Sequence, residues 1–237
     1  MTDILDLGGR VALVTGAGQG VGRQIALHLG GASNSGGVVV NDFVLERAEA
    51  VAEEIRAAGG KALALQCDVS NQAAVQDMVA KASSDLGAIG VLVNNAGNAG
   101  ATPSADARLP FWETGPEVWQ TFLGVNLYGV INCTGAVIPG MIERQAPGRI
   151  VTIISDASRW GDANMEIYAA GKAGAAGFMR SGSPFRVRSV AIALTATPAV
   201  ERTLNGDPER LKRQMEKYII RRPGRPDDVA NMVLFLS

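Results

Sequence analysis

Short runs of apolar, mostly β-branched residues alternate along the chain with longer segments in which apolar residues recur at helical spacing. Runs of about five apolar residues between turn residues are typical of buried strands, and the longer segments are typical of amphipathic helices. The predicted strands are residues 11–15, 38–42, 61–68, 89–93, 150–154 and 187–193. The predicted helices begin near Val21 and after Met165, and span residues 45–58, 71–86, 117–144 and 227–236.

Strands that are apolar at nearly every position, with helices between them, indicate a parallel sheet whose two faces are both covered. The sequence therefore predicts an α/β fold, a Rossmann-like doubly wound parallel sheet in three layers of helix, sheet and helix. With 237 residues, of which 47% are hydrophobic, the chain is long enough for a single domain of this kind over residues 1–237.

Charge and targeting signals exclude several classes of function. Twenty-two basic and 23 acidic residues give a formal net charge of -1, so no global positive field attracts nucleic acid. The amino terminus lacks a secretory signal, and no apolar run approaches the roughly 18–20 residues of a membrane span, so we expect a soluble, cytoplasmic protein. Cys67 and Cys133 are isolated and are interpreted as packed thiols. His28, the single histidine, has no clustered ligands, so we expect a structural or surface role and no metal site.

A glycine-rich turn follows the first predicted strand and leads into a helix. It reads TGAGQGVG from Thr15 to Gly22, with further glycines at Gly16 and Gly20. Such glycines let the backbone approach a pyrophosphate, and the N–H groups at the helix amino terminus attract its charge. The spacing is TGxxxGxG rather than GxGxxG, and a glycine-rich turn alone can be only a loop.

An acidic residue ends the second predicted strand. Asp42 follows Gly22 by 20 residues, where a carboxylate can accept hydrogen bonds from both ribose hydroxyls of an adenosine and repel a 2′-phosphate. This position favours NAD over NADP. Asp42 can also cap the helix that starts near Leu45; the two interpretations are compatible, and the first basic residue nearby is Arg47.

Tyr168 and Lys172 are the strongest candidates for chemistry. Four residues apart on a helix, their side chains lie one turn apart on one face, so the ammonium is expected to lower the pKa of the tyrosine. Such a tyrosine can give and take a proton in alcohol and ketone chemistry. Ser155, after the strand 150–154, can hydrogen-bond a substrate oxygen. A tyrosine and a lysine at this spacing also occur by chance in many helices.

The long helix 117–144 carries one polar residue in its apolar face. That face is expected to bury Trp119, Phe122, Val125, Val130 and Val137. Asn126 interrupts it and must find hydrogen-bond partners, either as a structural residue or as part of a site.

Two irregular segments could contact a substrate. Residues 98–116 contain three prolines, Phe111 and Trp112, and either line a pocket or pack as a surface loop. The segment 199–222 either engages an anionic substrate with its basic residues or presents them on a solvated helix face. These basic residues are Arg210, Lys212, Arg213, Lys217, Arg221 and Arg222.

Taken in order, these motifs resemble the short-chain dehydrogenase/reductase family over nearly the whole chain. The resemblance rests on TGxxxGxG at residues 15–22, NNAG at residues 94–97, Asn126, a serine 13 residues before Tyr168, and YxxxK at residues 168–172. It implies that Tyr168 is the proton donor and acceptor, that Ser155 orients the substrate oxygen, and that Lys172 lowers the pKa of Tyr168 and binds the nicotinamide ribose. Asn126 completes the implied catalytic tetrad. Ser158 is the second candidate for the role of Ser155.

The resemblance also implies an NAD site. Asp68 resembles the acid that contacts adenine, Asn94 resembles the residue that braces the central strand, and Thr197 is a candidate contact near the nicotinamide. The implied cofactor-binding residues are Gly16, Gln19, Gly20, Val21, Gly22, Asp42, Asp68, Val69, Asn95, Ala96, Gly97, Tyr168, Lys172 and Thr197.

Three features depart from the family pattern. Leu194 and Thr195 stand where the family has Pro-Gly, and residues 180–184 break the helix of Tyr168 about six residues early. The chain ends at Ser237, after the helix 227–236, where the family adds another strand. We therefore expect the final edge strand of the sheet to be missing and the full gene product to continue past Ser237.

The sequence thus predicts an NAD-dependent short-chain oxidoreductase that interconverts a secondary alcohol and a ketone. The small-molecule substrate is expected to be hydrophobic, no nucleic-acid or membrane partner is expected, and the protein is expected to form a homo-oligomer, either a dimer or a tetramer. Two alternatives remain open: an NADPH-dependent β-ketoacyl thioester reductase, and a dinucleotide-binding protein without turnover.

Overall fold

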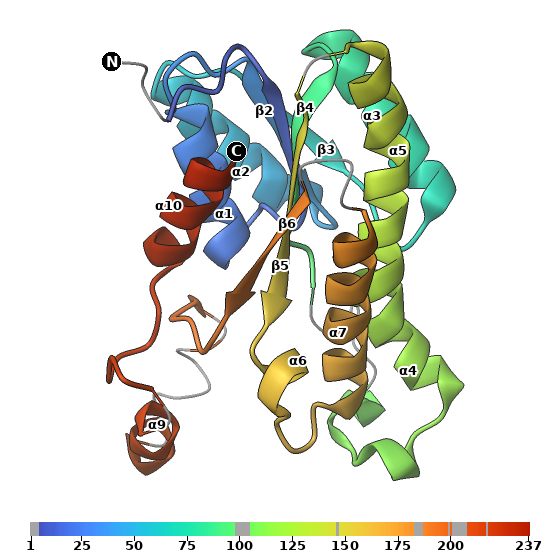
Figure 1. Cartoon of the computed structure of the whole chain (residues 1–237), viewed down its shortest axis with the longest axis vertical. Coiled ribbons are helices and arrows are strands. Elements are labelled where there is room, and N and C mark those ends of the chain that lie inside the picture. Colours follow the sequence, from blue (N-terminus) through green and yellow to red (C-terminus); the bar gives the residue numbers. More distant parts are fainter. Residues whose placement is uncertain are drawn as a thin grey trace.

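Six parallel strands form one sheet in the computed structural model of the chain (Figure 1). The structure describes residues 5–97, 105–145, 147–182, 187–198, 200, 208–216 and 218–237. The strands are β1 Val11–Val14, β2 Gly37–Asp42, β3 Ala62–Gln66, β4 Ile89–Asn94, β5 Arg149–Ser155 and β6 Val187–Ile192. Their order across the sheet is β3-β2-β1-β4-β5-β6.

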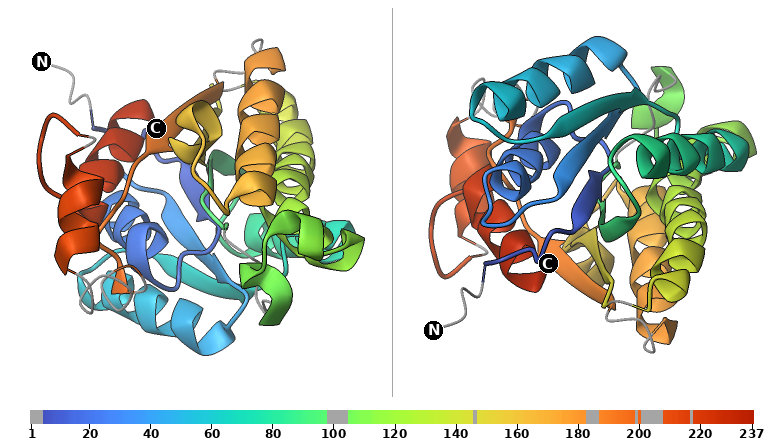
Figure 2. Two further views of the ribbon diagram at one scale, coloured as in Figure 1. Left: turned by 90° about the horizontal axis from the view of Figure 1, so that it is seen from below. Right: turned by 90° about the horizontal axis from the view of Figure 1, so that it is seen from above.

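Helices cover both faces of this sheet, as the views in Figure 2 show. They are α1 Gly20–Gly30, α2 Leu45–Ala57, α3 Gln72–Asp85, α4 Pro116–Leu123, α5 Gly129–Glu143, α6 Ala157–Trp160, α7 Glu166–Ser181, α9 Pro208–Met215 and α10 Pro226–Leu236. One face carries α1, α2 and α10, and the other carries α3, α5 and α7. At the end where β5 and β6 finish, Figure 1 shows α4, α6 and α9.

Side chains of β1 alternate between the two hydrophobic cores. Ala12 and Val14 lie in the core beneath α1, α2 and α10, whereas Val11 and Leu13 lie in the core beneath α3, α5 and α7. This alternation follows from the two-residue period of a strand. Full burial of a valine or leucine side chain contributes about 1.5–3 kcal/mol, so both cores stabilise the sheet. The predicted doubly wound sheet in three layers is confirmed.

The order of the strands reverses in the middle of the sheet. From β1 the chain continues through β2 and β3 on one side, and β4, β5 and β6 lie on the other side. At such a reversal the connections after the two central strands diverge, which opens a crevice beyond their carboxyl ends. Because β1 pairs directly with β4, the glycine turn and the NNAG segment both begin at this crevice.

The third strand is shorter than predicted. The sequence indicated residues 61–68, whereas β3 ends at Gln66 because the next residues turn the chain into α3. Asp68 Oδ1 accepts hydrogen bonds from the N–H and the hydroxyl of Ser70, at 2.9 and 2.7 Å. Asn71 then caps α3 by accepting the N–H of Ala74 at 3.1 Å. Local capping therefore ends the strand before the apolar pattern does.

The long helix predicted for residues 117–144 is interrupted. A π-helical turn, Gly124–Tyr128, separates α4 from α5. Val130 and Val137 on α5 are buried as predicted, but Trp119, Phe122 and Val125 are only half-buried. The reason is that α4 lies past the end of the sheet, whereas α5 packs on it (Figure 1).

The same stretch corrects an expectation about apolar length. Residues 116–143 are long and apolar enough, by length and composition, to cross a membrane. However, α5 packs against α3, α7 and β4, and its residues Cys133, Thr134 and Val137 are buried there. A helix that lies on the core of an α/β sheet has the same composition, so the length gives no membrane assignment.

The carboxyl-terminal part of the described chain returns to the sheet. The helix α7 ends at Ser181, where the sequence predicted a break, although residues 183–186 lie outside the described residues. Thr195 forms a parallel bridge with Gly224, so the segment after β6 is paired despite the departure from Pro-Gly. Within the described residues β6 lies at the edge of the sheet.

The single histidine lies between two helices. On α1, His28 Nε2 lies 3.3 Å from Asp227 Oδ1 on α10.

Asn94 links β4 to the adjacent strand β5 and to the covering helix α5. Its Nδ2 donates to Thr134 Oγ1 on α5 at 3.2 Å and to Thr152 Oγ1 on β5 at 3.1 Å. All three residues are buried. The bracing role implied for Asn94 by the sequence therefore has a geometric basis.

Replacement of Asn94 by alanine is expected to lower the free energy of unfolding by about 1–3 kcal/mol, because two buried hydroxyls lose a partner. Urea unfolding measures the change. The control is Thr134→Val, which keeps the bond to Thr152 and should cost less. If Thr134→Val proved more costly than Asn94→Ala, the brace would not be centred on Asn94.

Candidate active site

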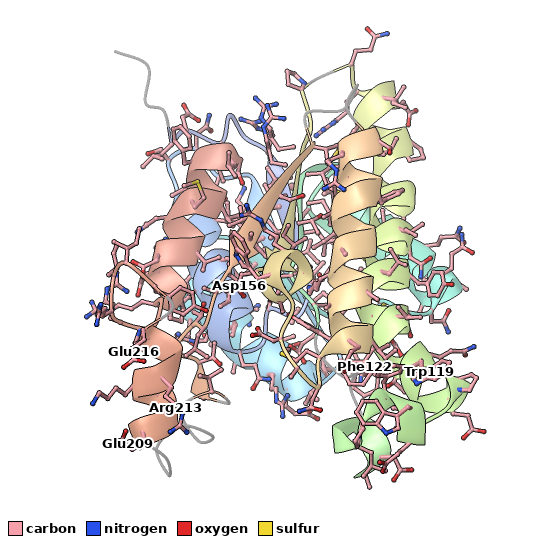
Figure 3. All side chains as sticks on the ribbon, turned by 60° about the horizontal axis from the view of Figure 1, so that its bottom comes forward. Trp119, Phe122, Asp156, Glu209, Arg213 and Glu216 are labelled. Carbon is pink, nitrogen blue, oxygen red and sulfur yellow. The ribbon has the colours of Figure 1, made fainter. Side chains whose placement is uncertain are left out.

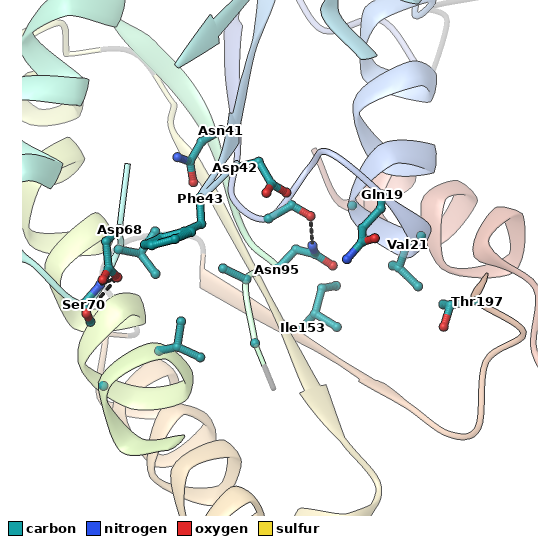
Figure 4. Close-up of a pocket in the computed structure, with 18 of the residues that line it drawn as sticks. Gln19, Val21, Asn41, Asp42, Phe43, Asp68, Ser70, Asn95, Ile153 and Thr197 are labelled. Atoms are coloured by element: carbon teal, nitrogen blue, oxygen red, sulfur yellow. Dashed lines mark hydrogen bonds between the residues drawn. The ribbon is translucent and has the colours of Figure 1, made fainter. Parts of the chain in front are cut away.

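A cavity of about 710 Å³ lies beyond the carboxyl ends of β1, β2 and β4 (Figure 4). Its size is that of a site for a cofactor or a small molecule. Every residue predicted to bind the cofactor lines it, from both sequence motifs and from the segments after β2, β3 and β6. These lining residues are Gly16, Gln19, Gly20, Val21, Gly22, Asp42, Asp68, Val69, Asn95, Ala96, Gly97, Tyr168, Lys172 and Thr197.

Hydrogen bonds of Thr15 and Asn95, called the clasp below, hold the turn after β1 against the turn after β4. Thr15 Oγ1 accepts the N–H groups of Asn95 and Ala96 at 3.0 and 3.1 Å. In return, Asn95 Nδ2 donates to the carbonyl oxygens of Thr15 and Gly16 at 2.9 and 3.0 Å. Asn95 was predicted to bind the cofactor, and its amide group also shapes the turn that would hold the cofactor.

Two glycines make this clasp possible. Gly16 has φ +61, a left-handed conformation that glycine adopts without strain, and a β-carbon there would press on Ala96. A β-carbon on Gly22 would strike the carbonyl oxygen of Gly16 and the amide of Asn95. The turn therefore closes only with glycine at both positions.

The amino terminus of α1 opens into the cavity. Gln19 is its N-cap residue and makes no capping hydrogen bond with its side chain, and the first turn contains no acidic residue. Gln19, Gly20 and Val21 all line the cavity. The unpaired N–H groups and the positive end of the helix dipole would favour an anionic group there, which fits the pyrophosphate of a dinucleotide.

Asp42 holds the glycine turn at Gly18. It is 6% exposed; its Oδ2 accepts the N–H of Gly18 at 2.9 Å, and its Oδ1 accepts the N–H of Val44, the N-cap residue of α2, at 3.0 Å. The carboxylate therefore closes the turn before α2 but does not cap the helix itself. It also lines the cavity at the position expected for ribose recognition. Arg47, one turn along α2, lies against Gly18 and lines the cavity too.

Ser155, Tyr168 and Lys172 come together where β5 ends. Lys172 is 3% exposed; its Nζ donates to the carbonyl oxygen of Ile153 at 2.9 Å and lies 5.9 Å from the centre of the Tyr168 ring. Tyr168 and Lys172 line the cavity, and Ser155 follows the lining residue Ile154 in the sequence. Ser155 Oγ accepts the N–H of Ala157 at 3.2 Å and hydrogen-bonds Tyr168.

Ser158 occupies a different position. Its hydroxyl donates to the carbonyl oxygen of Ser155 at 2.5 Å, which fixes the first turn of α6. The hydroxyl of Ser155, by contrast, faces Tyr168. The structure thus favours Ser155 over Ser158 as the partner of the tyrosine.

The π-helical turn places Asn126 next to Lys172. Asn126 is fully buried, and its Nδ2 donates to the carbonyl oxygen of Phe122 at 2.8 Å. A β-carbon on Gly97 would lie 2.9 Å from Lys172 Nζ and 3.0 Å from Asn126 Oδ1, so the two polar groups converge on the same spot. Single π-helical turns within α-helices are frequent at functional sites. Asn126 is therefore both a structural hydrogen bonder and a neighbour of the candidate catalytic lysine.

Burial has the largest effect on the pKa values of Lys172 and Tyr168. The pKa of Lys172 is lowered to about 8 because the buried ammonium loses its hydration. Burial also raises the pKa of Tyr168; the hydrogen bond with Ser155 lowers it, and the nearby charge of Asp156 raises it further. The pKa of Tyr168 is therefore raised, against the expectation that it would be lowered, because burial outweighs the other effects. The spacing showed that the two groups are close, but it did not show how deeply they are buried.

Neither of the two irregular segments is described over its whole length. In the segment 98–116, residues 98–104 lie outside the described residues, and none of the residues described between 105 and 115 lines the cavity. Trp112 is 67% exposed and packs edge to face with Phe111. Residues 199, 201–207 and 217 also lie outside the described part, and the side chain of Arg210 is not described.

The described basic side chains after β6 face solvent or pair within the chain. Lys212, Arg213 and Arg221 are exposed. Arg222 forms an ion pair with Asp228 at 2.8 Å, which raises the pKa of the guanidinium and lowers the pKa of the carboxyl to about 2. The interpretation of these residues as a solvated face is therefore favoured over contact with an anionic substrate.

Several residues of the cavity were not identified from the sequence. Phe43 and Ser70 follow the second and third strands, so strand ends alone could have indicated them. Gln120 and Thr121 on α4, and Met165 before α7, reach the cavity only through tertiary packing. No local pattern marks these three.

Comparison with known proteins agrees with this geometry. Residues 10–210 match the short chain dehydrogenase family, and the chain belongs to that family. The chain is 33% identical over 245 residues to a 7α-hydroxysteroid dehydrogenase of Escherichia coli (strain K12), covering 99% of this chain and 89% of the relative. It is 35% identical over 230 residues to a 3-oxoacyl-acyl-carrier-protein reductase of Staphylococcus epidermidis, covering 95% of this chain and 90% of the relative.

Solved structures share the fold along nearly the whole chain. A gluconate 5-dehydrogenase from Burkholderia cenocepacia in complex with NADP and tartrate has a TM-score of 0.87 and 29% identity, covering 99% of this chain and 90% of its own. A 7α-hydroxysteroid dehydrogenase complexed with NADH and 7-oxo glycochenodeoxycholic acid has a TM-score of 0.84 and 31% identity, covering 100% and 91%. The Rossmann-like fold and the class of oxidoreductase are thereby established, and the two neighbours hold different dinucleotides.

The lowered pKa of Lys172 predicts that stability depends on pH. Below pH 8 the lysine is charged in both states and the burial penalty is fully present. Between pH 8 and 10.5 the unfolded state binds more protons, so stability should rise with pH. Relative to Lys172→Met, the wild type should gain about 1–2 kcal/mol in the free energy of unfolding between pH 7.5 and 9.5.

Chemical unfolding at a series of pH values tests this difference. The thiols of Cys67 and Cys133, whose pKa values are raised to about 11 and 12 by burial, titrate alike in both proteins and cancel. The exposed Lys212→Met is the matched control and should leave the pH dependence unchanged. A wild type and a Lys172→Met variant with parallel curves would show that the buried lysine keeps its ordinary pKa.

Proposed function

We propose that this protein is an NAD-dependent oxidoreductase that interconverts a secondary alcohol and a ketone. The observation that carries the proposal is the convergence of Ser155, Tyr168 and Lys172 at the end of β5, beside a cavity lined by the glycine turn. The cavity offers an uncapped helix amino terminus for a pyrophosphate, a carboxylate for a ribose and a buried lysine at its other side. This set of groups fits a dinucleotide.

Each polar group has a role in the proposed reaction. NAD, when bound, supplies the hydride acceptor, and its reduced form supplies the donor. In the oxidation direction the Tyr168 oxygen takes the proton of the alcohol hydroxyl while the hydride leaves the carbinol carbon and the C=O bond forms. Ser155 would donate a hydrogen bond to the substrate oxygen, and Lys172 would hold the nicotinamide ribose. In the reduction direction the Tyr168 phenol returns the proton to the ketone oxygen.

Asp42 supports NAD as the preferred dinucleotide. Its carboxylate, fixed by the N–H groups of Gly18 and Val44, would repel the 2′-phosphate of NADP. The 7α-hydroxysteroid dehydrogenase neighbour holds NADH, whereas the gluconate 5-dehydrogenase neighbour holds NADP. Arg47, at the same end of the cavity, is the group that would favour NADP if the carboxylate were neutralised.

The substrate is proposed to be a hydrophobic small molecule. Apolar side chains contribute to the lining of the cavity, and they include Ile154, Met165, Ile192 and Val200. This lining agrees better with a steroid-like ligand, such as the one held by one neighbour, than with a polyhydroxy acid. An assembly of two or four copies of the chain, as the family resemblance implies, remains a proposal.

An NADPH-dependent β-ketoacyl thioester reductase is the second candidate. The observation in its favour is the 35% identity to a 3-oxoacyl-acyl-carrier-protein reductase. The charge of Asp42 argues against NADPH. A panel of secondary alcohols with NAD, run beside acetoacetyl thioesters with NADPH, separates the two enzymes, and nucleotide binding without turnover in either assay would support a non-catalytic protein.

Tyr168→Phe is expected to lower kcat at least about a hundredfold, because a positioned acid or base contributes roughly 10² to 10⁴ in rate. The affinity for NAD should stay within a few-fold, since the glycine turn and Asp42 are untouched. Steady-state kinetics and nucleotide fluorescence measure the two quantities. Tyr128→Phe, at an exposed tyrosine, is the matched control and should keep its activity. Equal loss of turnover and NAD binding in a folded Tyr168→Phe protein would remove the tyrosine from its proposed role.

The wild type is expected to prefer NAD, and Asp42→Asn is expected to narrow the preference by roughly tenfold or more, because the repelling charge is lost. Asp42→Asn retains one of the two acceptor oxygens, so one of the N–H groups of Gly18 and Val44 keeps its partner. The ratio of kcat/KM for the two cofactors is the measurement. In the Asp42→Asn background, Arg47→Ala should remove the gain with NADP. A wild type that favours NADP would show that Asp42 does not read the ribose.

A further inference from the structure

Asp156 connects the serine at the end of β5 to a distant part of the chain. Its Oδ2 accepts the hydroxyl of Tyr218 at 2.9 Å across 62 residues of sequence. Its Oδ1 lies 3.5 Å from Ser155 Oγ, and its backbone N–H donates to the carbonyl oxygen of Ile192 at 3.0 Å. In Figure 3, Asp156 lies between α9, which carries Arg213, and α4, which carries Phe122.

Tyr218 belongs to the segment that leads from α9 back to α10, residues 218–225. The backbone N–H of Leu194, just after β6, also donates to the oxygen of Tyr218. Farther along the segment, the N–H of Gly224 donates to the carbonyl oxygen of Leu194 at 2.9 Å, and the N–H of Ala196 donates to the carbonyl oxygen of Gly224 at 2.8 Å. The segment is therefore attached to the ends of β5 and β6 at two places.

The attachment at Tyr218 depends on one side chain. The next two residues, Ile219 and Ile220, are 101% and 68% exposed, so they supply little packing. The Gly224 attachment is made by backbone groups and does not involve Asp156. Loss of the bond between Tyr218 and Asp156 would therefore free the start of the segment while its end stayed fixed.

We propose that Asp156 is a positioning residue with two separable effects: its carboxylate anchors the segment 218–225 through Tyr218, and its charge acts on the pair Ser155 and Tyr168. The proposal rests on the proposed function, because it assigns Tyr168 the proton transfer. The anchor holds the segment 218–225 against residues 194–196, which lead directly into the cavity-lining residues Thr197 and Pro198. The charge governs the pH at which the tyrosine ionises.

The groups around Tyr168 show which one carries this charge effect. Ser155 favours the phenolate by hydrogen bonding, and Lys172 lies 5.9 Å from the ring centre. Asp156 is the acidic group that raises the pKa of Tyr168, together with burial. Burial raises the pKa of Tyr218, and Asp156 and Asp162 raise it further.

Three variants of the full chain separate the two effects. Asp156→Asn keeps an acceptor for Tyr218 but removes the charge. Tyr218→Phe keeps the charge but removes the anchor. Asp156→Ala removes both, and Glu216→Gln, an exposed acid just after α9, is the control for charge in general.

In alcohol oxidation kcat/KM should rise with pH as Tyr168 ionises. Asp156→Asn should move this rise to lower pH by roughly 0.5–1 unit, because the phenolate no longer meets a carboxylate. Tyr218→Phe should leave the pH profile in place and raise KM for the alcohol roughly two- to tenfold, with kcat and the NAD affinity nearly unchanged. Asp156→Ala should show both changes, and Glu216→Gln neither.

A measurement without turnover keeps the test independent of the proposed function. The chain has three tyrosines, so the ionisation of Tyr168 is the difference in phenolate absorbance between each protein and its Tyr168→Phe counterpart. Asp156→Asn should lower this pKa, and Tyr218→Phe should not. If wild type turns over no alcohol but the absorbance shift appears, the proposed function fails and the charge effect stands. If Asp156→Asn leaves both the absorbance pKa and the pH profile unchanged, or if Tyr218→Phe shifts them equally, Asp156 is a structural anchor only and the proposal is overturned.

Discussion

The clasp between the turn after β1 and the turn after β4 sets the geometry on which the rest of the site depends. Thr15 and Asn95 carry four hydrogen bonds between the turns of two adjacent strands, so the mouth of the sheet cannot widen without breaking several of them. The glycine turn directs the amino terminus of α1 into the cavity, and the NNAG segment places Gly97 against Lys172. One constraint thus aligns the nucleotide side and the chemical side of the site.

Burial of the Lys172 ammonium carries an electrostatic cost that a bound ligand can reduce. Lys172 is buried and donates to the backbone carbonyl of Ile153, and its lowered pKa reflects the cost of that burial. A bound nucleotide would bring ribose hydroxyls to Lys172, and hydrogen bonds to them would offset part of the burial penalty. The cofactor can therefore be a structural element of the active site, and it can change the protonation of Lys172 and Tyr168.

The sequence predicted those features whose cause is local. Alternating strand and helix patterns located the sheet, because each strand is covered on both faces, and TGxxxGxG and NNAG located the crevice because both turns follow central strands. The predicted end of β3 was wrong because local hydrogen bonds of Asp68 and Asn71 turn the chain, which the apolar pattern does not show. The predicted direction of the Tyr168 pKa shift and the predicted burial of Trp119 were wrong because both depend on tertiary packing that spacing does not encode. The hydrogen bond between Asp156 and Tyr218 could not be predicted from the sequence. It joins residues 62 positions apart that come together only in the folded chain.

The π-helical turn at Gly124–Tyr128 gives the long helix two independent faces. One extra residue rotates the preceding turns by about 100° relative to the later ones, since an α-helix turns 3.6 residues per revolution. The α5 face can therefore be shaped by the core of the sheet, while the α4 face, with Gln120 and Thr121, is shaped by the cavity. Changes that suit a new ligand can accumulate on α4 without disturbing the packing of the fold, and Asn126 stands at the joint between the two.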